Sequence, residues 1–208
     1  MPKIAWKPAT LLAPVPAVLV TCGNLEKPNL FTVAWTGIIN SIPPMTYISV
    51  RPERHSYSLI RESGEFALNL TTRSLCRATD FCGVRSGRDM DKFKQMDLHI
   101  EPAQKISAPL LAESPLSLEC RVTEIKELGS HHMFLAEIVA INVEENLIDK
   151  SGKLELSKAD LLAYAHGEYL NLGDKLGTFG YSVRKKRPAR HFKPGAYSKK
   201  ASKNKSSR

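Results

Sequence analysis

Short apolar runs follow one another along the chain, and several alternate with polar residues, a period of two that is typical of half-buried β-strands. The clearest alternation covers residues 117–128 and 131–143, which are separated by a Gly-Ser turn and therefore predict a long antiparallel hairpin. The remaining apolar runs lie at residues 15–22, 30–36, 45–50, 65–70 and 164–172. Glycine, asparagine and proline separate these runs at close spacing, as turns require. The pattern predicts a mainly β fold.

Three stretches predict short helices. Pro52 suits the first turn of a helix, and Gly64 ends that helix. Ser74 can cap a second helix that runs to about Cys82, and residues 157–163 predict a third. Because about seven strands outnumber the helices and do not alternate with them, we expect an antiparallel β-barrel with peripheral helices, and not a doubly wound parallel sheet.

The composition and the missing motifs exclude several classes of protein. The 208 residues suffice for one domain with a real core, and no apolar run reaches the ~20 residues that a membrane span needs. The sequence has no Rossmann fingerprint, no Walker A motif, no G-x-S-x-G and no H-E-x-x-H, so nothing predicts a dinucleotide-binding Rossmann site or a hydrolytic triad. The four cysteines form no C-x-x-C pair. We therefore expect no metal site, and reduced thiols in a cytoplasmic protein.

The net charge of +9 comes from one end of the chain. Residues 184–208 hold 11 basic and no acidic residues, which leaves 19 basic and 21 acidic residues in the first 183. We therefore predict a folded domain at 1–183 and a basic, flexible tail at 184–208. The tail is interpreted as a solubilising end. The alternative is a contact with nucleic acid or an acidic membrane surface, which would make the chain a basic-tailed nucleic-acid-associated protein.

The segment from Pro28 to Tyr57 carries the most chemical information. Arg51 ends a predicted strand, and the helix that follows begins with Pro52 and carries His55 and Ser56. The first turn of a helix presents unpaired N–H groups at its positive end, and arginine binds phosphate oxygens bidentately. This order of residues predicts a phosphate site. The alternative is that these side chains are ordinary surface residues.

Two loops add candidate ligand contacts. The predicted turn at residues 37–44 contains Asn40 and Ser41, which offer short polar groups next to the strand that carries Thr32. The polar loop CGVRSGRDMDKF, residues 82–93, could reach a phosphate or a second substrate, or could simply be solvated. Trp35 and His166 could contact a second substrate or a subunit interface, although a core position is the commoner outcome for such residues.

Taken in order, five segments resemble the flavin reductase-like family of FMN-binding split barrels, which includes flavoredoxin. They are PAVLVTCG, NLFTVAWTGIINSIPP, YISVRPERHSYSLIRESGEFALNL, DFCGVRSGRDMDKF and AHGEYLNLGDKLG. The resemblance implies a Greek-key antiparallel split β-barrel that forms a homodimer, with FMN rather than FAD bound without a covalent bond near the interface. No catalytic side chain is expected, because the flavin carries the chemistry.

The resemblance also implies roles by position. The residues that would line the flavin ring and ribityl chain are Thr32, Val33, Ala34, Asn40 and Ser41. Those that would hold the phosphate are Arg51, His55, Ser56 and Lys92, and the loop from Ser86 to Arg88 would close over it. Trp35 and His166 remain candidates for the second-substrate site.

The function expected on this basis is an FMN-dependent oxidoreductase in which NAD(P)H passes a hydride to flavin N5 and the reduced flavin serves a small-molecule acceptor. The first alternative is a flavoredoxin-type electron carrier or ferric reductase without a nicotinamide site of its own. The second alternative, from another class, is the nucleic-acid-associated protein with the basic tail.

Overall fold

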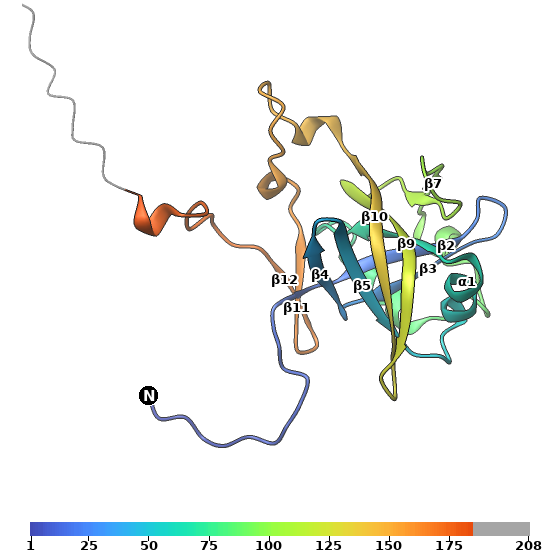
Figure 1. Cartoon of the computed structure of the whole chain (residues 1–208), viewed down its shortest axis with the longest axis horizontal. Helices are drawn as coiled ribbons and strands as arrows, with labels where there is room; N and C mark the ends of the chain where they lie inside the picture. The colour runs from blue at the N-terminus through green and yellow to red at the C-terminus, as the bar shows by residue number, and fades with distance from the viewer. Residues whose placement is uncertain (185–208) are drawn as a thin grey trace, which may run out of the picture. The chain divides into compact units, whose positions relative to one another are not determined.

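The computed structural model describes residues 1–184, and its centre is a seven-stranded antiparallel sheet with the strand order β3-β2-β6-β9-β10-β5-β4 (Figure 1). The strands are β2 (Val18–Gly23), β3 (Pro28–Val33), β4 (Thr36–Ser41), β5 (Pro44–Val50), β6 (Glu65–Leu70), β9 (Leu116–Glu127) and β10 (His132–Val143). Every pair of neighbouring strands is antiparallel. The predicted mainly β architecture is confirmed.

The long hairpin is formed by β9 and β10, as the alternating pattern predicted. Its turn contains Gly129 at a φ of +92°, a left-handed conformation that glycine adopts at little cost. Two irregularities in the β9–β10 register mark β-bulges, which increase the local twist and help the sheet to curl. On its other side β10 pairs with β5, so the hairpin joins the two halves of the sheet.

Residues of β2 alternate between two apolar cores. Val18 and Val20 face an inner core with Phe66 and Phe134, whereas Leu19 faces a second core that also contains Cys82. Successive side chains on a strand point to opposite faces, and both faces of β2 are covered. This double burial explains why the sequence of β2 is continuously apolar.

Three helices lie at the edge of the sheet: α1 (His55–Ser63), α2 (Cys76–Val84) and α3 (Lys92–Met96). The predicted start of α1 at Pro52 is wrong, because residues 52–54 form a turn that Arg54 N–H closes on Arg51 O at 3.0 Å. Ser74 does not cap α2, since its hydroxyl is hydrogen-bonded to that of Thr72. The sequence did not predict α3.

The predicted helix at 157–163 is also wrong. Only Leu156–Lys158 forms a 3-10 turn, and the following residues enter strand β11 (Leu162–Ala165). This strand lies between β1 (Val15–Pro16) and β12 (Glu168–Asn171) in a separate three-stranded sheet, so pairing with a distant segment overrides the local helix preference.

The predicted turn at 37–44 is shorter than expected. Residues 36–41 form β4, and the reversal to β5 takes only Ile42 and Pro43. The short strands β7 (Ile100–Glu101) and β8 (Leu110–Leu111) pair with each other, and 3-10 turns lie at Glu145–Leu147 and Tyr181–Val183.

The chain divides into two compact units, Met1–Asp174 and Lys175–Arg208. The described part of the second unit, residues 175–184, contains the 3-10 turn just mentioned. The predicted tail at 184–208 lies outside the described residues except for Arg184, and its domain boundary stays a prediction. Among residues 1–184, no helix is long and apolar enough to cross a membrane.

Candidate functional site

A small cavity rich in basic side chains, here called the basic cavity, lies where the start of α1 meets the loop between α2 and α3. Its volume is about 240 Å³. It is lined by Phe31, Glu53, Arg54, His55, Ser56, Arg85, Ser86, Gly87, Arg88, Asp89 and Lys92. Four of these residues are Lys or Arg and two are acidic, which gives a net charge of +2 with His55 neutral. The cavity is therefore suited to a dianion.

The first turn of α1 adds backbone donors to the basic cavity. The N–H groups of His55 and Ser56 have no acceptor within the helix, and they stand at the positive end of the helix dipole. Arg54, the residue before the helix, donates from Nη1 to the carbonyl oxygen of Gly83 at 3.0 Å. This bond fixes the start of α1 against the end of α2.

The loop that closes the basic cavity approaches β3 so closely that only glycine fits. A Cβ atom on Gly87 would lie 2.0 Å from Asn29 Oδ1. Asn29 is itself buried, and its Nδ2 donates to Ser56 Oγ at 2.7 Å. The hydroxyl of Ser56 accepts this bond and keeps its own O–H as a donor.

Lys92 is the most unusual residue of the basic cavity, because its side chain is buried. Only 4% of the residue is exposed, and Nζ donates to the carbonyl oxygens of Cys82 at 3.3 Å and Arg85 at 3.2 Å. Among the described residues no carboxylate forms an ion pair with it. Burial lowers the pKa of Lys92 below its usual value, although the neighbouring thiols oppose this effect. A bound anion would supply the missing countercharge.

Two buried thiols lie near Lys92. Burial raises the pKa of Cys22 and of Cys82 to about 11, so both remain protonated at neutral pH. The thiolate is the reactive form of cysteine, and these two side chains are therefore core residues in this state.

A second cavity of about 340 Å³, the central cavity, shares Phe31 and Arg54 with the basic cavity. Its walls come from the ends of β3 and β5, the end of α2 and the β11–β12 hairpin. The lining residues are Ala17, Phe31, Thr32, Val33, Ala34, Trp35, Ser49, Val50, Arg51, Arg54, Asp80, Gly83, Val84, His131, Tyr164, Gly167 and Tyr169. Since the walls are shared, one elongated ligand could occupy both cavities.

Several titratable groups face the central cavity, and the environment shifts the pKa of two of them, His131 and Tyr169. Burial, reinforced by Arg51 and Arg54, lowers the pKa of His131, so the imidazole is neutral at pH 7. Burial raises the pKa of Tyr169 to about 12, and the Asp80 carboxylate acts in the same direction. The phenol therefore keeps its proton over the physiological pH range.

Most of the predicted site residues lie in these two cavities. His55, Ser56, Ser86, Arg88 and Lys92 line the basic cavity. Thr32, Val33, Ala34, Trp35 and Arg51 line the central cavity. Arg51 thus lies beside the predicted phosphate group and not within it, because the turn at 52–54 separates it from the start of α1.

Thr32 lines the central cavity, but its hydroxyl is already used in a hydrogen bond within the protein. Thr32 donates its hydroxyl to the carbonyl oxygen of Thr79, and a Cβ atom on Gly83 would lie 3.4 Å from Thr32 Cβ. Thr32 therefore attaches β3 to α2 by a partly buried contact in addition to lining the cavity.

Asn40 and Ser41 are not brought to either cavity within one subunit. Asn40 and Ser41 are paired with Met45 and Pro44 at the start of β5, whereas Arg51 follows the end of β5. Since an extended strand rises about 3.3 Å per residue, the two ends of β5 are about 20 Å apart. Both are exposed, and Asn40 Nδ2 donates to Pro43 O at 2.8 Å. Their predicted contact with the flavin would require a second subunit.

The sequence did not single out Arg54 or Arg85, and it predicted Gly87 only as part of the closing loop. Arg54 could have been found, since it is three residues after Arg51 and immediately precedes His55. The role of Gly87 depends on its distance to Asn29, a residue far away in the sequence, and no local pattern reveals it.

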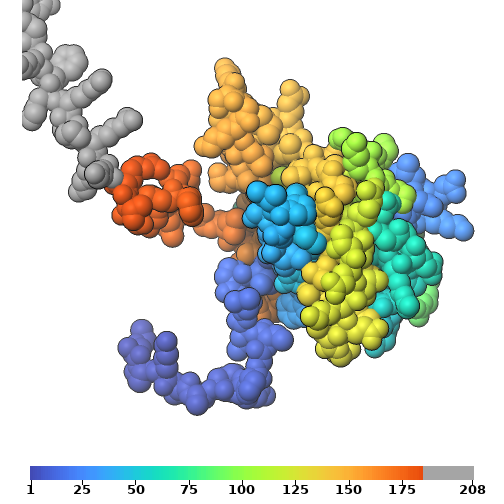
Figure 2. All heavy atoms as spheres, viewed as in Figure 1, coloured from blue at the N-terminus to red at the C-terminus, as the bar shows by residue number. Residues whose placement is uncertain are grey.

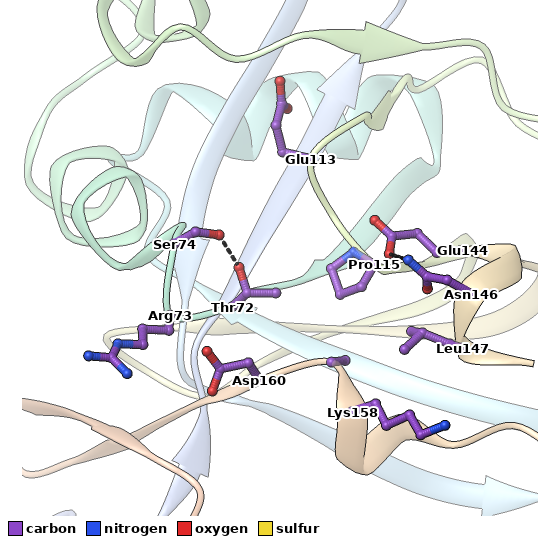
Figure 3. A pocket seen from close by; sticks show the side chains of 11 residues that line it. Thr72, Arg73, Ser74, Glu113, Pro115, Glu144, Asn146, Leu147, Lys158 and Asp160 are labelled. Atoms are coloured by element: carbon purple, nitrogen blue, oxygen red, sulfur yellow. Dashed lines mark hydrogen bonds between the residues drawn. The ribbon is translucent and has the colours of Figure 1, made fainter.

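A larger cavity, of about 660 Å³, lies elsewhere in the described part of the chain and contains none of the predicted site residues (Figure 3). It is lined by Thr72, Arg73, Ser74, Glu113, Pro115, Glu144, Asn146, Leu147, Lys158, Ala159 and Asp160. Two of its charges already have partners, because Glu113 pairs with His99 and Lys158 with Glu155. Its size alone gives no reason to place the chemistry there.

The model of the family described as flavin reductase like domain matches residues 11–173. The chain belongs to this family. Among solved structures it is similar to the flavoredoxin of Desulfovibrio vulgaris (Miyazaki F), with a TM-score of 0.81 and 29% identity over 88% of this chain and 100% of that one. A flavoredoxin from Methanosarcina acetivorans has a TM-score of 0.79, 29% identity and the same coverage. The predicted family is confirmed.

More distant similarities agree with this assignment. A protein of Shewanella frigidimarina with a split barrel domain has a TM-score of 0.72 and 24% identity over 81% of this chain and 87% of its own, which confirms the split-barrel fold. The reductase component of a 4-nitrophenol monooxygenase from Rhodococcus opacus is 25% identical over 121 residues, 58% of this chain and 62% of that protein. Family and neighbours together support a flavin-related oxidoreductase.

Proposed function

We propose that the protein binds FMN, with the phosphate in the basic cavity and the isoalloxazine ring in the central cavity, and acts as an oxidoreductase. The observation that carries this proposal is the cavity of net charge +2 at the start of α1, which shares Phe31 and Arg54 with a larger and more apolar cavity. The flavoredoxin neighbours and the FMN-binding protein of Thermus thermophilus support a flavin as the ligand.

The basic cavity fits a phosphate monoester in charge and in hydrogen bonding. A phosphate monoester carries about −1.5 to −2 charges at pH 7, close to the opposite of the cavity charge. Arg88 and Ser86 can reach it from the closing loop, and the N–H groups of His55 and Ser56 from the helix. Lys92 would provide a buried cation beneath it. Because Gly87 has no side chain, the loop can lie directly against the site.

The central cavity fits a planar heterocycle with one polar edge. When bound, the flavin supplies a hydride acceptor and an electron store, which no side chain of the chain provides. Val33, Ala34 and Trp35 lie at the point where β3 ends, and backbone groups there would meet the polar edge, apart from the Trp35 carbonyl oxygen, which accepts from Ser49 N–H at 2.9 Å. Val50 and Phe31 are buried apolar residues that exclude water from the same cavity.

The titratable residues would hold protons in fixed positions around the ring. Tyr169 keeps its phenolic proton, and Asp80 is the acceptor that favours this state. His131 is neutral and can donate from one ring nitrogen and accept at the other. Arg51 and Arg54 keep the rim of the cavity positive, which would stabilise a reduced, anionic flavin.

We further propose NAD(P)H as the hydride donor and a small molecule as the final acceptor. A flavoredoxin-type electron carrier is the second candidate, since flavoredoxins are among the structural neighbours. Anaerobic addition of NADH or NADPH to the flavin-loaded protein separates the two. Rapid bleaching of the flavin absorbance at catalytic rates supports the enzyme, and an unchanged spectrum supports the carrier.

A homodimer completes the proposal. The β4–β5 hairpin carries three isoleucine side chains that are largely exposed in the single chain, Ile38, Ile39 and Ile42. In Figure 2 the light-blue atoms of this hairpin lie uncovered on the face toward the viewer. An uncovered apolar surface of this kind is typical of subunit interfaces, and pairing across it would give Asn40 and Ser41 a route to the flavin of the other subunit. Light scattering that gives the mass of a single chain would refute the dimer.

Purified protein titrated with FMN and with riboflavin tests the central proposal. We expect FMN to bind substantially more tightly, because riboflavin lacks the phosphate that the basic cavity would hold. Equal affinities would contradict the placement of the phosphate, and no change in flavin fluorescence with either compound would refute flavin binding altogether.

A further inference from the structure

A further cavity of about 310 Å³, here called the arm cavity, adjoins the central cavity and shares Trp35, Tyr164 and Gly167 with it. The other walls are His166, Val15 and residues 10–13 of the segment that precedes β1. Its volume is at the lower end of the range for small-molecule sites, roughly 300 to 1,000 Å³. The three cavities therefore lie in series, from the basic cavity through the central cavity to the arm cavity.

The arm cavity differs from the other two in having no charged wall residue. Its side chains are an indole, a phenol, an imidazole and aliphatic or hydroxyl groups. The central cavity, by contrast, contains Arg51, Arg54 and Asp80, and six charged residues line the basic cavity. Aromatic walls without charge favour a neutral flat ring, which they contact face to face or edge to face.

We propose that the arm cavity binds the ring of the second substrate, a neutral planar aromatic or quinonoid group, beside the flavin. This inference rests on the proposed function. If the phosphate lies in the basic cavity at one end, the isoalloxazine ring points toward Trp35 and Tyr164 at the other end. An incoming ring in the arm cavity would then adjoin the part of the flavin that exchanges electrons.

Strand pairing and a tight turn hold the β1 and β11–β12 walls of the arm cavity in place. Val15 of β1 pairs with Tyr164 of β11, and the Tyr164 and Tyr169 rings form an edge-to-face contact with centroids 5.5 Å apart. His166 has a φ of +49° and Gly167 a φ of +93°, the pair of left-handed residues found in the tightest hairpin turns. This turn places the His166 imidazole at the cavity, where it can hydrogen-bond a carbonyl or amide of the ligand.

The lack of charged side chains also predicts which oxidants the arm cavity should not bind, namely anions. Ferric chelates with carboxylate ligands and ferricyanide are anions, and no cationic side chain lines this cavity to compensate them. Two substrates share the favoured chemistry: the nicotinamide ring of the donor, and an aromatic or quinone acceptor.

The test uses the full-length, flavin-loaded protein, photoreduced without oxygen and mixed with either p-benzoquinone or ferricyanide. p-Benzoquinone takes up a hydride and a proton to give hydroquinone, while the reduced flavin returns to its oxidised form. Ferricyanide accepts single electrons and has no ring. The flavin dissociation constant is measured first for each variant.

Leu11→Ser makes one wall of the arm cavity polar, and Ile4→Ser is the matched control, because Ile4 belongs to the same segment but does not line the cavity. His166→Gly removes the imidazole while tolerating the left-handed backbone, and His166→Asn retains a polar group in the same conformation. We expect Leu11→Ser and His166→Gly to raise the half-saturating quinone concentration by about 3- to 10-fold. Ile4→Ser should have no effect, and His166→Asn a smaller one.

The rates with ferricyanide should change by less than about twofold in every variant. The substitutions remove a hydrogen bond or an apolar contact to a bound ring, and ferricyanide has no ring. Equal losses with both oxidants, or an unchanged quinone dependence in Leu11→Ser and His166→Gly, would overturn the inference while leaving flavin binding intact. Absence of flavin binding in the unmodified protein would instead overturn the proposed function.

Free nicotinamide identifies the source of the ring. Competition with NADH in the reductive half-reaction supports the donor ring as occupant, and competition with p-benzoquinone supports the acceptor. If nicotinamide competes with neither and the wall variants leave both half-reactions unchanged, the arm cavity is not a substrate site.

Discussion

The contact between Gly87 and Asn29 leads to the sharpest prediction. A methyl group on Gly87 would lie 2.0 Å from Asn29 Oδ1 and 3.1 Å from Asn29 Cγ, so one of the two residues must move. Asn29 is not free to rotate, because it is buried and its amide is hydrogen-bonded to Ser56. Gly87→Ala should therefore either break this bond or push the closing loop away from β3.

The size of the effect follows from these two costs. Overpacking a buried contact costs about 1–3 kcal/mol, and loss of the Asn29–Ser56 hydrogen bond about 0.5–1.5 kcal/mol. We expect Gly87→Ala to lower the free energy of unfolding by about 2 kcal/mol, or Tm by roughly 4–8 °C for a chain of this length. FMN affinity should fall by about 10-fold, because a displaced loop withdraws Ser86 and Arg88 from the phosphate, and riboflavin affinity should not change.

A double-mutant cycle with Asn29→Ala tests the cause. Removing the Asn29 amide creates space, so adding Gly87→Ala to Asn29→Ala should cost less than about 0.5 kcal/mol, with a coupling energy of at least about 1 kcal/mol. Gly173→Ala is the control, because nothing lies within 4 Å of its Cβ position. Denaturant unfolding gives the stabilities and fluorescence titration the affinities. Strictly additive effects would show that the clash does not determine the position of the loop.

The other predictions concern the charged residues around the proposed flavin site. Arg88→Ala should weaken FMN binding by about 10-fold or more, the loss of a charge-assisted bond, and leave riboflavin binding unchanged in calorimetry. Arg51→Ala should weaken both ligands alike, because Arg51 lines the central cavity; a loss confined to FMN would assign it to the phosphate. Since burial lowers the pKa of Lys92 and a bound dianion would raise it, FMN binding should take up protons between the lowered pKa and the usual value near 10.5. Calorimetry in two buffers of different ionisation enthalpy measures this uptake, which Lys92→Met should abolish. In the same window the unfolded chain binds more protons at Lys92 than the folded one, so the stability of the unmodified apo-protein relative to that of Lys92→Met should rise with pH; the fall caused by the buried thiols is common to both proteins.

Most of the barrel could be predicted from the sequence because its strands are marked by apolar runs or by alternating apolar and polar residues. The alternation at 117–128 and 131–143 predicted both strands of the long hairpin, and the five matching segments alone indicated the family. The errors lie where pairing with distant residues decides the structure. Residues 162–165 form a strand only because β1 and β12 flank them, and α3 begins at an Asp91 cap within an otherwise polar loop.

The candidate site could be predicted only in part. Residues close in sequence, such as His55 and Ser56, were grouped correctly in one cavity, since a helix turn brings them together. Arg51 was assigned to the same group, but the non-helical turn that follows it directs it to the neighbouring cavity. The buried state of Lys92 and the close approach of Gly87 arise from tertiary packing. Neither has a local sequence pattern.

The pairing of β1 with β11 has a consequence for when the central cavity forms. Ala17, near the start of the chain, and Tyr169, close to the end of the first unit, are walls of the same central cavity. A ribosome must therefore finish nearly all of this unit before the pocket exists, and contacts between such distant segments form late. Binding of the proposed flavin would thus follow translation, and the nascent barrel would have to remain soluble without this ligand until then.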